Sequence, residues 1–174
     1  MSPGEAPIEI VAADAAWPAR FELERQALTQ ALGPWLTGPV EHIGSTAVPG
    51  LAAKAVIDIM AGVASLDTSR PAIDAAAALG YCYYPYRPDR EHWFCKPSPA
   101  FRTHHLHLVP FGSEQWRGTL AFRDYLRAHP ADAAEYAALK MQLARQYRDD
   151  REAYTQAKSA FISRVTGLAL AGGE

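Results

Sequence analysis

The stretch that decides the fold covers residues 41–59 and reads EHIGSTAVPGLAAKAVIDI. Its first residues complete a short apolar strand, which we expect over residues 40–43. A second strand is expected over residues 55–63, and it is apolar enough to be buried on both faces. A turn rich in small polar residues therefore lies between two strands, and one carboxylate, Asp58, stands inside the second strand.

The turn consists of Gly44, Ser45 and Thr46. A glycine at the end of a strand lets the backbone come close to a ligand, because glycine has no Cβ atom. A helix is expected to start here, and helix N-termini favour anions, so the hydroxyl and N–H groups of Ser45 and Thr46 indicate a phosphate site. The competing interpretation is an ordinary turn in which Ser45 or Thr46 caps the helix.

The rest of the chain alternates helical and extended patterns. A first helix is expected over residues 14–32 with Asp14 as its N-cap, and Gly38-Pro39 after it marks a turn. The later elements are expected as a helix at 70–79, strands at 81–86, 91–96 and 103–109, and apolar helical stripes from residue 113 onward, the last starting at Asp149. Tyr136 and Tyr154 lie in these stripes and are interpreted as core. This order predicts a mixed α/β or α+β domain, a sheet flanked by helices with a helical C-terminal third.

Composition limits the function. A length of 174 residues suits one domain over residues 1–174, and 49% apolar with 21% charged residues is ordinary for a globular protein. The net charge of −2 (17 − 19) disfavours broad nucleic-acid binding and membrane-surface binding. We find no secretory signal and no stretch long enough to span a bilayer, so a cytoplasmic location is expected. Cys82 and Cys95 are expected to be buried and reduced.

Asp58 and three histidines could carry chemistry. A carboxylate among apolar neighbours is costly unless it is paired, hydrogen-bonded or bound to a metal. The structural alternative is that Asp58 caps a neighbouring loop or pairs with Lys54 or an arginine. Strand alternation places His105 and His107 on one face, and such a pair suits a divalent metal or a phosphate. A metal needs a third ligand, for which Asp58 and His42 are the candidates. The competing interpretation of the two histidines is a hydrogen-bonded polar strand face.

The run over residues 41–59 resembles the signature of the GrpB family. Segments 102–107, 122–127, 136–140 and 154–158 are similar to that family as well, so the resemblance covers nearly the whole chain. It implies the nucleotidyltransferase fold. In that fold a glycine–serine turn holds the phosphates of a nucleotide, and this chain has Gly44, Ser45 and Thr46 there. A carboxylate pair on the following strand holds divalent metal ions.

This chain departs from the carboxylate pair that the resemblance implies. Asp58 is the first member, but Met60 stands at the second position, and a thioether cannot replace a carboxylate toward Mg²⁺. The downstream strand carries His105 and His107 where a third carboxylate is implied. One aspartate with two or three histidines, His42 included, is a softer ligand set than paired carboxylates. The identity of the expected divalent ion therefore stays open between Mg²⁺, Mn²⁺ and Zn²⁺.

Three functions stay open. The first is a metal-dependent transferase or hydrolase that acts on a nucleotide or another phosphorylated small molecule, with Asp58 and Ser45 as catalytic residues. The second is a non-catalytic nucleotide- or phosphate-binding module that lost its second carboxylate at Met60. The third is an interaction domain that uses the C-terminal helices. Four basic residues are candidates for binding an anionic substrate: Lys54, Lys96, Arg102 and Arg123.

Overall fold

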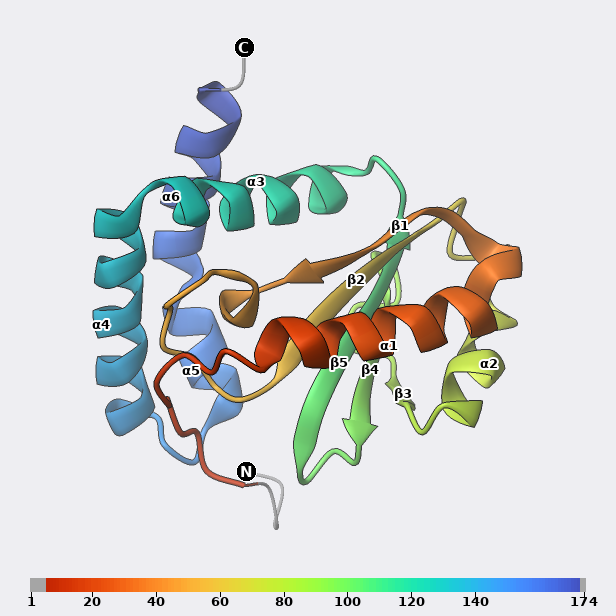
Figure 1. Ribbon diagram of the computed structural model, residues 1–174, viewed down its shortest axis with the longest axis horizontal. Helices are drawn as coiled ribbons and strands as arrows, with labels where there is room; N and C mark the ends of the chain where they lie inside the picture. Colours follow the sequence, from red (N-terminus) through yellow and green to blue (C-terminus); the bar gives the residue numbers. More distant parts are fainter. Residues whose placement is uncertain (1–5, 173–174) are drawn as a thin grey trace.

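The computed structural model describes residues 6–172, and its centre is a five-stranded sheet (Figure 1). The strands lie in the order β1-β2-β5-β4-β3. Their bounds are β1 Leu36–Ile43, β2 Ile57–Val63, β3 Cys82–Tyr84, β4 His92–Pro97 and β5 Arg102–Pro110. β2 and β5 are parallel, and the other neighbouring strands are antiparallel. The mixed sheet expected from the sequence is confirmed.

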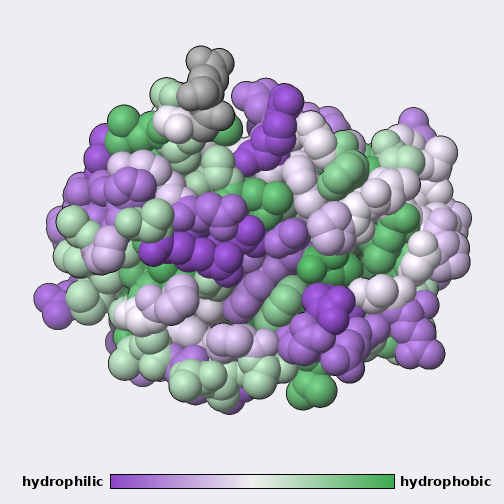
Figure 2. Space-filling model, turned by 45° about the horizontal axis from the view of Figure 1, so that its top comes forward, coloured by the Kyte–Doolittle hydropathy of each residue, from purple (hydrophilic) through white to green (hydrophobic). Residues whose placement is uncertain are grey.

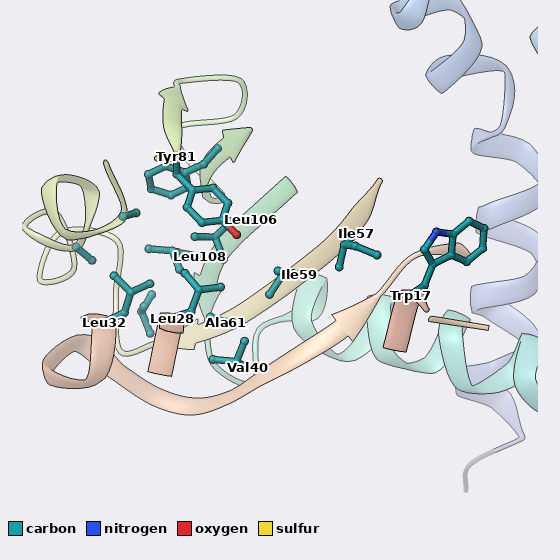
Figure 3. Close-up of a cluster of buried hydrophobic side chains, with 14 of the residues drawn as sticks. Trp17, Leu28, Leu32, Val40, Ile57, Ile59, Ala61, Tyr81, Leu106 and Leu108 are labelled. Atoms are coloured by element: carbon teal, nitrogen blue, oxygen red, sulfur yellow. The ribbon is translucent and has the colours of Figure 1, made fainter. Parts of the chain in front are cut away.

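Helices α1 (Trp17–Leu32) and α2 (Ala72–Ala78) cover one face of this sheet (Figure 1). Leu28 of α1 packs there against Ile59 and Leu106 of the two parallel strands, and all three side chains are fully buried (Figure 3). Burial of one such side chain contributes about 1.5–3 kcal/mol. This cluster is the main core, and it fixes which residues of β2 and β5 point to the opposite face.

The C-terminal third is helical, as expected, with α3 (Glu114–Ala128), α4 (Pro130–Gln146), α5 (Arg151–Ala157) and α6 (Ser159–Ala171). Helices α4 to α6 stand beside the end of the sheet where β1 finishes and β2 begins (Figure 1). Val48 and Leu51, from the segment between those strands, pack against Tyr136 of α4 and Phe161 of α6. The segment after β1 is therefore enclosed between the sheet and the C-terminal helices.

Two expectations at the start of the chain are wrong. Gly38-Pro39 is no turn but part of β1, which is an edge strand and has an irregular register between Leu36 and Val40. An edge strand tolerates proline at such an irregularity, because one side of the strand needs no ladder partner. Asp14 does not cap α1; it accepts a hydrogen bond from the Ala16 N–H group in the turn that precedes the helix.

Two expectations near the C-terminus and at the cysteines also need correction. The N-cap of α5 is Asp150, which accepts from the Ala153 N–H group, rather than Asp149. Cys95 is buried, whereas Cys82 is only half-buried; the two are register partners on β4 and β3, and no disulfide joins them.

The molecular surface is mixed in character. Figure 2 turns the top of Figure 1 forward and shows hydrophilic side chains across the middle of that face, with hydrophobic ones in separate groups between them. None of the helices in the described part of the chain combines the length and the apolar character that a membrane crossing requires.

Candidate functional site

The turn after β1 places backbone directly against a carboxylate. Gly44 has φ 71° and ψ −171°, a conformation that only glycine adopts without strain. A Cβ atom at this position would lie 2.6 Å from Oδ2 of Asp58. The close backbone approach expected at Gly44 is therefore present, and its immediate neighbour is the side chain of Asp58.

The helix expected to start at the turn does not form. Ser45–Ala47 makes one turn of 3₁₀ helix, η2, and Val48 is already extended. Pro49 explains the stop, because a proline disfavours helical geometry in the residue before it. The turn therefore offers N–H and hydroxyl groups to an anion, but no α-helix follows whose dipole would add to the attraction.

Asp58 is held by a histidine on the neighbouring parallel strand. Residues 58 and 105 are register partners of β2 and β5, and Nδ1 of His105 lies 2.9 Å from Oδ1 of Asp58. Burial would raise the pKa of the Asp58 carboxyl, but the hydrogen bond with His105 and nearby positive charges lower it to about 2. Burial lowers the pKa of His105. The pair is thus an aspartate that orients a neutral imidazole, whose Nε2 is buried and has no partner among the described residues.

His107 shares this face but belongs to a second pair. Its Nδ1 lies 2.6 Å from Oε2 of Glu91, and the Nε2 group of Gln115 donates to the same oxygen at 3.1 Å. Burial would lower the pKa of His107, but the Glu91 carboxylate raises it above its usual value. The polar strand face expected from His105 and His107 therefore consists of two separate histidine–carboxylate pairs. Glu91 and Gln115 have no motif in the sequence that could have identified them.

The structure does not bring His42 into this cluster. His42 is paired with Ile59 in the register of β1 and β2, so it points to the face opposite Asp58. Its ring stacks on Phe21 of α1, and its Nε2 lies 2.9 Å from Oγ1 of Thr46. Burial lowers the pKa of His42 to about 4. His42 and Thr46 thus hold the turn on the sheet face that α1 covers, and they do not line the Asp58 face.

The expected metal set of Asp58, His105, His107 and His42 is therefore not assembled. Within residues 6–172, no three or more histidine, cysteine, aspartate or glutamate side chains are placed to hold one metal ion. Asp58 is hydrogen-bonded to Nδ1 of His105, and Glu91 is hydrogen-bonded to Nδ1 of His107, so the two histidines belong to separate pairs.

Three lysines converge on Asp58 from the loop and the C-terminal helices. Lys54 lies between η2 and β2, Lys140 on α4, and Lys158 at the junction of α5 and α6. Burial, with the charges of Lys158 and Lys54, lowers the pKa of Lys140 to about 7. Burial and the charge of Lys54 lower the pKa of Lys158 to about 8. Asp58 acts in the opposite direction on all three lysines.

Two tyrosine rings, those of Tyr136 and Tyr154, face the ammonium groups of the lysines. The Nζ atom of Lys140 lies 4.8 Å from the ring centre of Tyr136, and that of Lys158 lies 4.3 Å from the ring centre of Tyr154. Lys54 also faces Tyr154, at 5.4 Å. Burial raises the pKa of Tyr136 well above its usual value, and a hydrogen bond with Ser45 opposes that rise. Ser45, the tyrosines and the lysines therefore belong to one partly buried cluster, which we call the lysine cluster.

Lys140 and Lys158 were not among the residues expected at the site, although the sequence carries a signal for both. Their helices share the pattern Tyr-x-x-x-Lys, at residues 136–140 and 154–158, and this spacing stacks a lysine over a tyrosine on one helical face. The chain has only four lysines, and three of them meet in this cluster. Tyr136 and Tyr154 are buried, as expected of core residues, but each also faces a cation.

Of the other expected anion-binding groups, Lys96 and Arg123 lie away from the lysine cluster, whereas the charge of Arg102 helps to lower the pKa of Lys54. Lys96 pairs with Glu24 of α1 at 2.6 Å, on the face opposite Asp58. Arg123 of α3 donates to Glu41 at 2.6 Å and to the carbonyl oxygen of His42 at 3.0 Å, so it ties α3 to β1. Arg102 lies over the ring of Trp93, at 5.3 Å.

A family model described as "GrpB protein" matches residues 7–167 of this chain. The UPF0157 protein of Pseudomonas aeruginosa is 43% identical over 168 residues, which cover 94% of this chain and 68% of that protein. The glutamate-rich protein GrpB of Alkalihalophilus pseudofirmus is 32% identical over 154 residues, covering 86% of this chain and 88% of that protein.

One similar solved structure is a GrpB protein, and a second, more distant one has the same fold. The crystal structure of the conserved protein GrpB from Enterococcus faecalis matches with a TM-score of 0.85 and 37% identity, over 94% of this chain and 98% of that one. The GLD-2/RNP-8 complex matches with a TM-score of 0.57 and 12% identity, over 87% and 60% of the two chains. At that identity the likeness concerns the fold alone, which is the nucleotidyltransferase fold expected from the sequence. This chain belongs to the GrpB family.

Proposed function

We propose that the lysine cluster binds the phosphate groups of a nucleotide or another phosphorylated small molecule, and that the protein acts on it as a nucleotidyltransferase-like enzyme with a divalent cation. One observation carries the proposal: Lys54, Lys140 and Lys158 are gathered around a single carboxylate, Asp58, beside the Gly44-Ser45 turn.

The electrostatics of the cluster favour an anion. Three ammonium groups and one carboxylate leave a net charge of +2 in a partly buried space. Lys54 and Lys158 make Lys140 harder to protonate, and Lys54 does the same to Lys158. A phosphate group would remove that repulsion and accept charge-assisted hydrogen bonds from the lysines and from Ser45. A polyphosphate carries enough charge to balance the cluster.

A divalent cation fits this site only together with the ligand. Mg²⁺ is commonly bound by one or two carboxylates and by the phosphates of the substrate, so Asp58 and phosphate oxygens would hold it. When bound, such an ion neutralises charge on the phosphate oxygens. A resident ion held by histidines does not fit, because the described residues bring no three metal-ligating side chains together.

The fold comparison supports a nucleotide as the ligand. One solved chain of this fold is Cid1 in complex with a UTP analog, with a TM-score of 0.52 and 14% identity. The likeness itself extends to the fold only, so the lysine cluster has to provide the evidence for binding in this chain.

The second candidate function is a binding module without catalysis, and Met60 favours it. Met60 is 1% exposed and stands where the resemblance implies a second metal carboxylate. Its register partner on β1 is Glu41, and that carboxylate is bound to Arg123. Asp58 therefore has no second carboxylate beside it at this position.

Binding is tested with ATP, UTP and pyrophosphate as probes, each with and without MgCl₂, by isothermal titration calorimetry on the full chain. We expect Lys140→Met and Lys158→Met each to weaken binding by about 10- to 100-fold, because a hydrogen bond to a charged group contributes about 1.5–3 kcal/mol. Lys96→Met is the matched control, since Lys96 also faces a tyrosine ring, Tyr81, but lies on the other face. Equal losses in all three variants, or no binding by the wild type, would refute the proposal.

Catalysis is tested separately with Asp58→Asn. An enzyme should release pyrophosphate from a nucleoside triphosphate in the presence of Mg²⁺ and an acceptor, and the variant should lose this turnover while it still binds the nucleotide. Tight binding by the wild type without turnover across a panel of hydroxyl-bearing acceptors would favour the binding module.

A further inference from the structure

The sheet face that carries Asp58 continues past His105 onto the hairpin of β4 and β3. Trp93 is the register partner of His107, and Tyr84 is the register partner of Trp93, so both share the face of the histidine pairs. Tyr86 follows β3 and also contacts the Trp93 ring. We call Tyr84, Tyr86 and Trp93 the aromatic platform.

The platform is exposed and reaches the candidate site. Tyr84 is 58% exposed and Tyr86 is 49% exposed, while Trp93 is half-buried between them and the sheet. The ring centre of Trp93 lies 6.3 Å from each tyrosine ring centre and 5.1 Å from that of His105. A continuous row of flat rings therefore leads from the hairpin to the Asp58–His105 pair.

The charged groups around the platform are mainly arginines. The guanidinium group of Arg102 lies over Trp93 at 5.3 Å, and that of Arg87 lies over Tyr86 at 5.2 Å. Arg90 is exposed on the same connection, next to Asp89 at 3.8 Å. Three arginines and one aspartate therefore border the platform, in a chain whose net charge is −2. Glu91 does not offset this charge at the surface, because it is buried on His107.

We propose that the aromatic platform binds a short single-stranded nucleic acid, whose bases stack on Tyr84, Tyr86 and Trp93 and whose phosphates meet the arginines. Exposed aromatic rings interleaved with basic residues are the combination that holds single strands, because every base has a flat face and every linkage a negative charge. Arginine also stacks on aromatic planes while it binds phosphate. A site of three rings suits only a few nucleotides, which agrees with a chain that is not basic overall.

This inference does not depend on the lysine cluster. The two sites use different residues and different elements, so each can fail alone. If both hold, the platform would lead an end of the strand toward His105, on the face where Asp58 lies.

The test is fluorescence anisotropy of the full chain with a fluorescein-labelled RNA tetranucleotide, with single-stranded DNA and a self-complementary RNA duplex as comparison probes. We expect the single strands to bind and the duplex to bind at least tenfold more weakly. Trp93→Ala and Tyr84→Ala should each weaken single-strand binding about tenfold or more, and Trp93→Phe should recover most of the loss. Tyr83→Ala is the matched control, because Tyr83 neighbours Tyr84 but points to the opposite face.

The arginines have their own readout. Arg87→Gln and Arg102→Gln should each reduce the slope of log affinity against log salt by about 0.7, the value for one phosphate contact on a single strand. Lys140→Met should leave tetranucleotide binding intact, which separates this site from the lysine cluster. Equal binding of duplex and single strand, or a Tyr83→Ala loss as large as that of Trp93→Ala, would overturn the proposal. The proposal would also be overturned if the wild type does not bind the probe and instead forms a dimer that Trp93→Ala dissociates. The platform would then be an interface between two copies of the chain.

Discussion

Gly44→Ala tests the geometry on which the candidate site rests. The change adds one methyl group to the turn after β1, where φ is +71° and ψ is −171°. The new Cβ would lie 2.6 Å from Oδ2 and 3.1 Å from Cβ of Asp58, closer than real Cβ contacts allow. Because the three nearest atoms all belong to the Asp58 side chain, that side chain has to move, and its hydrogen bond with His105 is then broken or lengthened.

The expected cost has two parts. A non-glycine residue held in this region of φ and ψ costs about 1–3 kcal/mol. Loss of the hydrogen bond between Asp58 and His105 adds about 1.5–3 kcal/mol if both partners stay buried. For a domain of this size, each kcal/mol lowers Tm by about 2–4 °C. The variant should therefore melt roughly 5–20 °C below the wild type and bind polyphosphate more weakly.

Two further variants separate strain from collision, and all are measured by thermal and urea unfolding. Gly50 also has a positive φ, +76°, but an added Cβ meets nothing within 4 Å, so Gly50→Ala reports backbone strain alone. Asp58→Ala removes the carboxylate that the new methyl group would strike, so Gly44→Ala should cost less in that background. If Gly44→Ala is no more destabilising than Gly50→Ala, and its cost is unchanged in Asp58→Ala, the close contact between Gly44 and Asp58 does not exist.

Three further outcomes are expected. Polyphosphate affinity should fall as the pH rises from about 7 to 9, because bound phosphate needs the charged form of Lys140, whose pKa is about 7. Phosphate itself titrates near pH 6, so its own charge changes little over this range. Calorimetry should show a shallower slope of affinity against pH for Lys140→Met. Glu91→Gln should lower the free energy of unfolding by about 1.5–3 kcal/mol, since it removes the charged partner of His107; urea unfolding that matches the wild type would contradict this. Met60→Asp should be destabilised by about 3–5 kcal/mol, because the new carboxylate lies in an apolar cluster with Trp116; a Tm that 10 mM Mg²⁺ raises more than in the wild type would show that a cation site had formed.

The fold could be predicted largely because local signals and burial agree. Strand alternation correctly placed His105 and His107 on one face, and the parallel register of β2 and β5 adds Asp58 to that face. The boundaries failed where tertiary contacts override local signals. Gly38-Pro39 reads as a turn, but Gly38 lies in β1 under the ring of Phe111, which a side chain at this position would strike.

The site was only half predictable, because its charges come from distant parts of the chain. Asp58 and Gly44 belong to one motif, and their contact follows from the antiparallel register of β1 and β2, in which Ile43 is opposite Asp58. Glu91 reaches His107 from the connection before β4, and Lys140 reaches the carbonyl oxygen of Ala52 across 88 residues. No periodicity encodes such pairs, because the first depends on the pairing of β4 with β5 and the second on how α4 packs beside the sheet.

Met60 shows how the structure changes the meaning of a missing group. From the sequence it marks a lost metal ligand on the Asp58 face. In the structure it packs with Ile43, Val109 and Trp116, where α3 meets the sheet. A carboxylate at this position would need either a cation or a displaced α3, because apolar side chains surround it. The Met60 side chain therefore covers the Asp58 face with apolar atoms on the side of α3. A cation that acts here would have Asp58 as its carboxylate ligand and would take its remaining ligands from the phosphate and water. Catalysis at this site would then depend more on the lysine cluster than on metal ligands supplied by the chain.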